Sequence, residues 1–133
     1  VVPSLIHKCF IAKNNRTPMK VWGDGKPWRE FIYSKDVAKA CLEVLDKNIK
    51  LPSKLIVSGT KEIQIEKLVN MICEIFAYHN VEWTPTKSNG NAKRTTSKKF
   101  FNFILPSFKF TEIEDALKQT VEWFLINYST LRR

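Results

Sequence analysis

The most informative stretch of this chain is Val21-Trp22-Gly23-Asp24-Gly25-Lys26-Pro27-Trp28-Arg29-Glu30-Phe31-Ile32-Tyr33-Ser34-Lys35-Asp36-Val37-Ala38. A short apolar run leads into a Gly-Asp-Gly-Lys-Pro loop, and an Arg-Glu-Phe run follows before a helix that starts near an aspartate. The loop therefore presents an indole and a guanidinium on a compact turn. Trp22 has a ring that stacks on flat ligands, and Arg29 can form two parallel hydrogen bonds with one phosphate. This pair of side chains suits a nucleotide that carries a diphosphate.

The pattern Trp-Gly-x-Gly-x-Pro-x-Arg-Glu-Phe in this stretch resembles the extended short-chain dehydrogenase/reductase superfamily, in its nucleotide-sugar-modifying branch. Over the whole chain, the similarity is greatest to the C-terminal part of the GDP-L-fucose synthase family of NADPH-dependent epimerase/reductases. Four further pieces agree in order with that family, at residues 1–6, 57–60, 87–90 and 120–125.

The resemblance implies an α/β fold, mostly helical with a few short strands. It is the fold of the C-terminal substrate-binding portion of an extended short-chain dehydrogenase/reductase, without the Rossmann core. Residues 1–133 would form one substrate-binding C-terminal domain. The chain opens on Val1-Val2-Pro3 and not on Met, so we take it for a fragment that lacks the N-terminal NADP-binding domain.

The function that the resemblance implies is that of a nucleotide-sugar-binding portion. In this family the complete enzyme epimerises GDP-4-keto-6-deoxy-mannose at C3 and C5 and then reduces C4 with NADPH. NADP would be bound through the missing domain, and this chain alone would bind no cofactor. The expected partners are the GDP-sugar substrate and either a second copy in a homodimer or the missing domain, in the cytoplasm. Another nucleotide-sugar epimerase or dehydratase is the nearest alternative.

The composition leaves a second class of function open. The chain of 133 residues has 22 Lys and Arg against 13 Asp and Glu, a formal net charge of +9 that suits any polyanion. Basic and aromatic residues alternate at 98–101, as in modules that bind nucleic acid, but the signature of a known nucleic-acid fold is absent. A non-catalytic interaction module is the third reading. No apolar run approaches the roughly 20 residues of a membrane span.

Three residues of the informative stretch and the segment before it are candidate ligand contacts, each with an ordinary structural alternative. In the family that the chain resembles, the arginine at the place of Arg29 contacts the diphosphate; the alternative is an ion pair with Glu30 or Asp36. Trp22 matches a substrate-binding tryptophan, whereas most tryptophans simply pack in a core. Lys8 matches a basic residue that reaches a phosphate, although a helix lysine is usually solvated.

The segment from Lys87 to Arg94 resembles the family motif Lys-Pro-Asp-Gly-Thr-Pro-Arg-Lys, which supplies an acidic and a basic group to the nucleotide. Asn89 stands in the place of the aspartate, and an amide both accepts and donates hydrogen bonds, so the preference for guanine is in question. Lys93 or Arg94 would serve as the basic group. A plain basic surface loop is the alternative.

The residues for hydride and proton transfer are absent from the sequence. There is no Gly-x-x-Gly-x-x-Gly turn for a dinucleotide. The three tyrosines are not followed by Lys in a Tyr-x-x-x-Lys motif. No catalytic residue and no metal ligand is therefore assigned. The three cysteines, Cys9, Cys41 and Cys73, have no CxxC spacing and are expected to be buried free thiols in a reducing compartment.

The hydrophobic pattern predicts most of the helices and strands. Helices are expected over 3–12, from Asp36 onward, over 65–79 and after Thr111, and strands over 20–22, 30–33, 55–58 and 81–84. Asp36 would cap or begin its helix, and Thr111 with Glu114 matches a capping box. The run at 55–58 is apolar on both faces, which suits a central parallel strand in the sheet of the absent domain.

Overall fold

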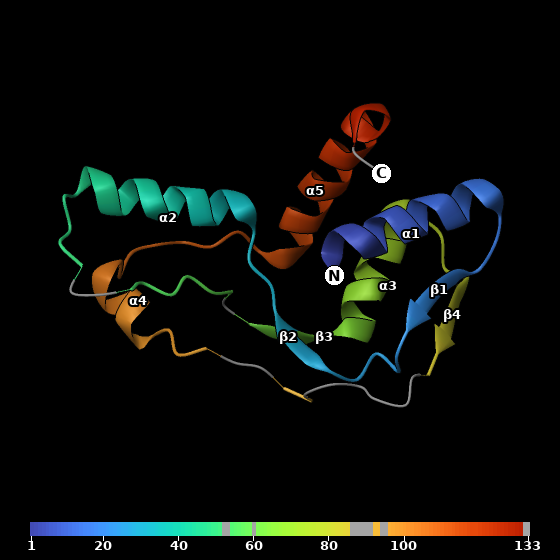
Figure 1. Cartoon of the computed structure of the whole chain (residues 1–133), viewed down its shortest axis with the longest axis horizontal. Coiled ribbons are helices and arrows are strands. Elements are labelled where there is room, and N and C mark those ends of the chain that lie inside the picture. Colours follow the sequence, from blue (N-terminus) through green and yellow to red (C-terminus); the bar gives the residue numbers. More distant parts are fainter. Residues whose placement is uncertain (52–53, 60, 86–91, 94–95, 132–133) are drawn as a thin grey trace.

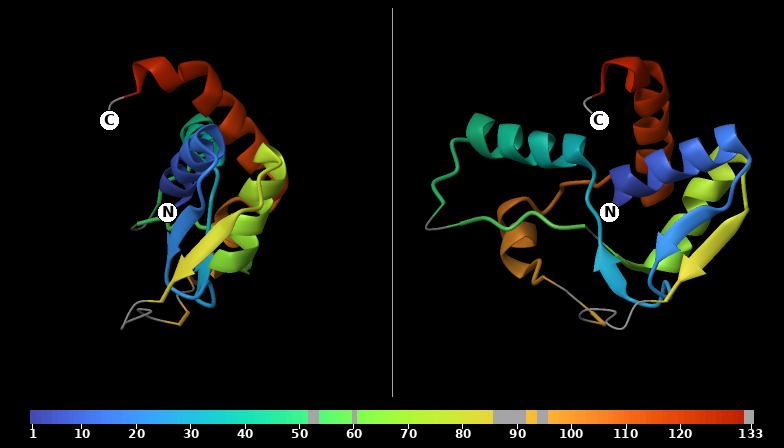
Figure 2. Two further views of the ribbon diagram at one scale, coloured as in Figure 1. Left: turned by 90° about the vertical axis from the view of Figure 1, so that its right-hand side faces the viewer. Right: turned by 45° about the vertical axis from the view of Figure 1, so that its right-hand side comes forward.

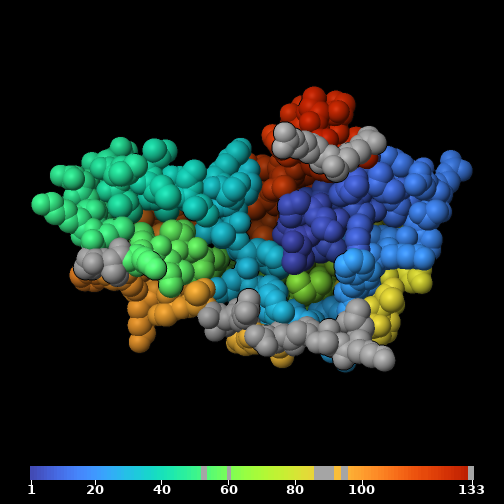
Figure 3. All heavy atoms as spheres, in the orientation of Figure 1, coloured from blue at the N-terminus to red at the C-terminus, as the bar shows by residue number. Residues whose placement is uncertain are grey.

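The structure is a computed structural model, and it describes residues 1–51, 54–59, 61–85, 92–93 and 96–131. Figure 1 shows two lobes. The larger lobe contains three helices and a pair of strands, the smaller lobe contains two helices, and a second pair of strands lies between the lobes. In the space-filling view, the atoms around this second pair fill the region between the lobes (Figure 3).

The larger lobe is built on α1 (Val2–Asn15), α3 (Ile65–Phe76) and α5 (Ile113–Asn127). A proline in the first turn suits the start of α1, where its missing N–H costs nothing. Both α1 and α3 end on a residue in the left-handed conformation, Arg16 with φ 54° and Ala77 with φ 47°. The 3₁₀ helix η1 (Tyr128–Thr130) follows α5 directly.

One two-stranded sheet flanks these helices. β1 (Met19–Trp22) pairs in parallel with β4 (Val81–Thr84), with Met19 opposite Val81 and Trp22 opposite Thr84. Figure 2 shows the two strands side by side at the edge of the lobe. The strand predicted over 81–84 is confirmed, and β1 begins one residue before its predicted start.

The core of the larger lobe is made by the inner faces of the three helices and by β1. Its fully buried side chains at the centre of the packing are Ile6, Cys9, Met19, Leu68, Val69, Ile72, Cys73 and Leu117. Because α3 is apolar at positions three and four apart, its whole inner face is removed from water, which is the main source of its stability.

The three cysteines do not share one environment. Cys9 of α1 and Cys73 of α3 are buried, and a hydrogen bond between their thiols raises the pKa of Cys9 and lowers that of Cys73. Burial raises the pKa of Cys9 further. All three thiols are free, as predicted, but Cys41 lies exposed on α2. The expectation that Cys41 is buried was therefore wrong: α2 packs through the face that carries Asp36 and Ala40, and Cys41 lies outside that face.

The smaller lobe contains α2 (Ser34–Asp46) and the short helix α4 (Lys99–Ile104). Ala40, Phe101 and Leu105 form its buried cluster, and Phe108 packs edge-to-face on both Phe101 and Phe110. The aromatic segment from which α4 forms had no clear period in the sequence; Phe101 is buried in the structure, whereas Phe103 is 79% exposed.

Two strands connect the lobes. β2 (Trp28–Glu30) pairs antiparallel with β3 (Glu62–Gln64), and Arg29 lies opposite Ile63. The strand predicted over 30–33 is thus wrong in its bounds, since its partner β3 has only three residues to pair with. Close by, a Cβ atom on Gly59 would overlap the carbonyl oxygen of Phe31, so only glycine allows these two backbones to approach.

Residues 55–58 form no strand within the described chain, where no other strand lies beside them, and Ile56 is 56% exposed; their pairing with the sheet of an absent domain stays a prediction. The predicted capping box was wrong. Thr111 is not the N-cap of α5, whose N-cap is Glu112 without a side-chain bond. The amide and hydroxyl of Thr111 instead donate to Asp36, at 2.8 and 2.9 Å.

Asp36 has a larger role than the helix start assigned to it. It is the third residue of α2, where a carboxylate is favoured by the helix dipole, so that part of the prediction is confirmed. It is also only 6% exposed, and its two oxygens accept both hydrogen bonds from Thr111. Asp36 therefore ties the start of α2 to the segment that leads into α5.

Candidate functional site

The glycine loop at 23–27 connects β1 to β2 and carries a candidate ligand residue at each end. Gly23 and Gly25 have φ values of 93° and 75°, which side chains other than glycine rarely adopt. A Cβ atom on Gly25 would lie 2.8 Å from Cβ of Glu66 and 2.9 Å from the ring of Trp83. The amides of Ile65 and Glu66 donate to carbonyls of this loop. The first turn of α3 therefore fixes the conformation of the loop.

Trp22, at the first end of the loop, is exposed and not part of the core. Its side chain is 75% exposed, which removes the core alternative. The Nζ atom of Lys8 lies 4.5 Å from the centroid of the indole and donates to the carbonyl of Lys20 at 3.0 Å. Lys8 thus holds a cation against one face of the ring. The structure brings these two predicted residues together.

Arg29, at the other end of the loop, lines a groove between the lobes. One of its guanidinium N–H groups donates to the carbonyl of Trp28 at 2.7 Å. The two carboxylates considered as its ion-pair partners are engaged elsewhere: Glu30 with Lys98 at 3.4 Å, and Asp36 with Thr111. The groove has a volume of about 540 Å³, and its other lining residues are Glu30, Ile32, Ile56, Val57, Ser58, Gly59 and Thr96.

Lys93 lies beside β2, the strand that carries Arg29. Trp28 pairs with Lys93 in parallel, and the amide of Trp28 donates to the carbonyl of Ala92 at 2.9 Å. The Nζ atom of Lys93 lies 2.8 Å from Oε2 of Glu62 on β3. Lys93 thus shares the face of the sheet that carries Trp28 and Glu62, whereas the side chain of Arg29 points to the other face, because successive side chains of a strand alternate. Asn89 and Arg94 lie outside the described residues.

Ser58 is a feature of the groove that the sequence did not reveal. Its hydroxyl oxygen is buried and has no hydrogen-bond partner, whereas buried polar atoms nearly always have one. A single serine in an apolar run gives no signal of this kind, because its partners depend on the folding of distant segments.

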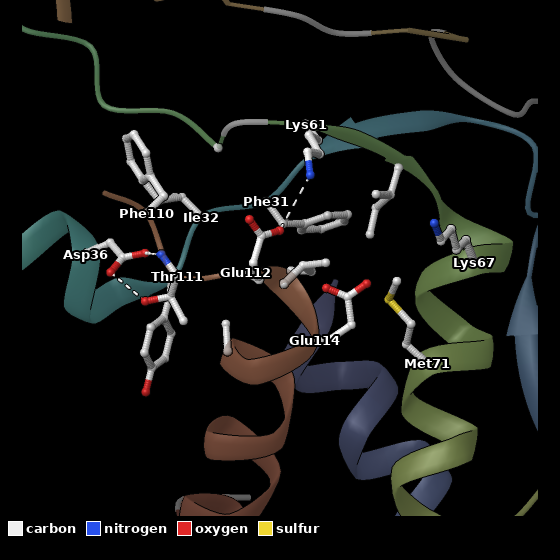
Figure 4. Close-up of a pocket in the computed structure, with 15 residues that line it drawn as sticks. Phe31, Ile32, Asp36, Lys61, Lys67, Met71, Phe110, Thr111, Glu112 and Glu114 are labelled. Carbon is white, nitrogen blue, oxygen red and sulfur yellow. Dashed lines mark hydrogen bonds and ion pairs between the residues drawn. The ribbon is translucent and has the colours of Figure 1, made fainter. Parts of the chain in front are cut away.

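A smaller pocket of about 130 Å³ lies behind the groove, and the two share Ile32 and Gly59 as lining residues. Figure 4 shows its apolar wall, which includes Phe31 and Met71, and charged groups of both signs at its rim. The dashed line between Lys61 and Glu112 marks an ion pair of 3.6 Å. Two lysines and three carboxylates line the pocket, so its lining has a small excess of negative charge.

Within the described part of the chain, no three His, Cys, Asp or Glu side chains are placed to hold a metal ion. Nor is any helix of that part long and apolar enough to cross a membrane.

Comparisons with known proteins agree with the motifs. The family model described as NAD dependent epimerase/dehydratase family matches residues 1–58. The GDP-L-fucose synthase of Dictyostelium discoideum is 34% identical over 135 residues, which cover 100% of this chain and 42% of that protein. GDP-L-fucose synthase 1 of Arabidopsis thaliana is 33% identical over 96% of this chain and 39% of its own length.

The solved structures give the same result for the fold. A GDP-L-fucose synthetase from Naegleria fowleri bound to NADP superposes with a TM-score of 0.91 at 35% identity, over 100% of this chain and 42% of that one. The resemblance to the C-terminal part of GDP-L-fucose synthases is therefore confirmed, as is the fold class. The chain spans about two fifths of the length of the relatives that it matches, and these are nucleotide-sugar epimerases and reductases.

Proposed function

We propose that residues 1–133 form the nucleotide-sugar-binding domain of a GDP-L-fucose synthase-like, NADPH-dependent epimerase/reductase that acts on GDP-4-keto-6-deoxy-mannose. The observation that carries this proposal is the position of Arg29 on the wall of a groove, with an exposed indole at the other end of the same rigid loop. The similarity to GDP-L-fucose synthases over the entire chain supports it.

The described residues have complementary roles in this proposal. Arg29 binds the diphosphate through two N–H groups, because a planar guanidinium matches the geometry of phosphate oxygens. Lys93, which is ion-paired with Glu62, is a basic nucleotide contact proposed from the 87–94 motif. The outer face of Trp22 stacks on the guanine, since Lys8 already covers the other face. Asn89 and Arg94 complete the set as nucleotide contacts proposed from the sequence.

The residues of this chain do not fit a dinucleotide cofactor. Gly23 and Gly25 precede the strand β2 and not a helix, so no helix N-terminus is available behind them for a pyrophosphate. We therefore assign NADP to an N-terminal domain, present in the same protein or supplied by a partner, and derive no hydride-transfer step here. A homodimer and a reducing compartment such as the cytoplasm complete the proposal, and the three free thiols suit such a compartment.

Calorimetry with GDP, UDP and dTDP tests the proposal on the whole chain. GDP should bind, and Arg29→Ala should weaken it about 10- to 150-fold, which corresponds to the roughly 1.5–3 kcal/mol of a charge-assisted contact. Arg29→Lys should also weaken binding, because an ammonium cannot replace the two parallel bonds. Lys118→Ala, an exposed change on α5, is the control. Unchanged GDP binding by Arg29→Ala contradicts the proposal.

The same panel separates the alternatives. Preference for UDP or dTDP would indicate another nucleotide-sugar epimerase or reductase. This alternative remains because Asn89 replaces the carboxylate of the family motif that contacts the nucleotide. A relative from Streptomyces bikiniensis, named as a dTDP-4-dehydro-6-deoxy-D-allose reductase, is 24% identical over 93% of this chain. Tight binding of DNA or RNA that weakens steeply with salt would instead support the nucleic-acid reading.

A further inference from the structure

The hydroxyl of Ser58 is a buried donor without a partner. Among the side chains that the structure describes, it provides the one buried nitrogen or oxygen atom that lacks a hydrogen bond. Burying a hydroxyl without a partner costs free energy, since the group loses its bonds to water and gains none in return. A side chain in this state lowers the stability of the ligand-free protein. A ligand that accepts the hydrogen bond of this hydroxyl would remove that cost.

The position of Ser58 relative to Arg29 is fixed by the backbone. Ser58 precedes Gly59, and Gly59 packs so closely on the carbonyl of Phe31 that a Cβ atom would overlap it. Phe31 follows Arg29 by two residues at the end of β2. The segment that carries Ser58 is therefore held against the strand that carries Arg29, and both side chains line the same groove.

We propose that the Ser58 hydroxyl donates a hydrogen bond to a phosphate oxygen of the ligand that Arg29 binds. This inference rests on the proposed function and adds a positioning residue to it. A serine hydroxyl turns among three staggered positions of χ1, and its hydrogen follows the acceptor that is present. Since a diphosphate offers several oxygens, the hydroxyl and the guanidinium do not compete for one acceptor.

The proposal predicts effects of opposite sign on stability and on binding. Ser58→Ala removes the unpartnered hydroxyl, so the ligand-free protein should melt at the same temperature as the parent or higher. The same change should weaken GDP about 5- to 10-fold, as expected for the loss of one hydrogen bond. A hydroxyl with a purely structural role gives the reverse: lower stability and unchanged affinity.

The experiment combines thermal unfolding with calorimetry on the full chain and uses GDP, inorganic pyrophosphate and guanosine as probes. Ser58→Ala should weaken GDP and pyrophosphate and leave guanosine unchanged, whereas Ser58→Thr, which keeps the hydroxyl, should bind like the parent. Thr120→Val is the matched control, because the Thr120 hydroxyl is satisfied by the carbonyl of Ala116 at 2.6 Å. That variant should lose stability and keep its affinity.

The outcomes separate this inference from the proposed function. If the parent binds neither GDP nor pyrophosphate, the proposed function is wrong. If the parent binds both and Ser58→Ala binds them equally well, the role of Ser58 is overturned while the proposed function stands. Weaker binding of guanosine by Ser58→Ala would also overturn the inference, because the hydroxyl would then contact the nucleoside and not a phosphate.

Discussion

Replacing Asp36 with alanine removes the buried link between α2 and the segment before α5. Asp36 is 6% exposed, and its oxygens accept the amide of Thr111 at 2.8 Å and its hydroxyl at 2.9 Å. In Asp36→Ala both donors lose their acceptor, and the N-terminal turn of α2 loses its only acidic side chain.

The expected loss follows from these three contributions. A hydrogen bond to a charged group is worth about 1.5–3 kcal/mol, and a carboxylate in the first turn of a helix adds roughly 0.3–1 kcal/mol. Since the two bonds share one side chain, their contributions do not add fully. We expect Asp36→Ala to lower the free energy of unfolding by about 3–4 kcal/mol, a large share of the total of a domain of this size.

The measurement is urea unfolding followed by tryptophan fluorescence. Asp115→Ala is the matched control, because Asp115 is likewise the third residue of its helix, α5, but its side chain is 65% exposed and pairs only with Lys118 at 4.0 Å. The control should lose less than about 1 kcal/mol. Thr111→Val, which keeps the amide, should fall between the two.

Equal losses in Asp36→Ala and Asp115→Ala would refute this reasoning, because the helix dipole would then account for the whole effect and the bonds to Thr111 for none of it. A double-mutant cycle of Asp36 with Thr111 measures the share of the hydroxyl bond directly.

Three further predictions concern the chain as a whole. It should not oxidise NADPH in the presence of nucleotide sugars, since it has neither the glycine turn nor the Tyr-x-x-x-Lys motif; turnover measured with pure protein would contradict this. Under native conditions a thiol reagent should modify Cys41 alone, because Cys9 and Cys73 are buried, and the hydrogen bond that Cys9 makes with Cys73, together with burial, raises the pKa of Cys9; unfolding should release three reactive thiols. The exposed apolar residues near Ile56 should make the chain self-associate and bind a hydrophobic dye, and Ile56→Lys should reduce both effects in sedimentation and dye titrations.

The elements that the sequence predicted are those whose apolar residues recur with a regular period. The face of α3 and the strand β4 are both clear in the pattern; β4 is confirmed at its predicted bounds, and α3 is confirmed but ends at Phe76, before its predicted end at residue 79. Periodicity reports only which face is buried. It did not locate α4, whose aromatic residues have no regular spacing. It also does not show whether an apolar run such as residues 55–58 has a neighbouring strand to pair with, and no strand of the described chain does so.

The candidate site was predicted in part because its motif is local. The loop at 23–27 and the residues at its ends are contiguous, so their resemblance to a family motif was readable from the sequence. The contacts that modify their roles are distant: Lys8 reaches Trp22 from α1, Lys93 reaches β2, and Ser58 lines the groove beside Arg29. Such contacts exist only once separate segments have packed together.

The parallel pairing of β1 with β4 also has a consequence for the order of folding. Met19 must find Val81, so the strand pair closes a long loop that includes α2 of the smaller lobe and α3 of the larger one. The entropy of closing such a loop slows folding more than it lowers stability. At ribosomal speeds of about 5–20 residues per second, β1 waits roughly 3–12 s for its partner to be synthesised. During that interval its apolar residues are available to chaperones, because most of the α3 and α5 residues that cover Met19 and Val21 are synthesised later.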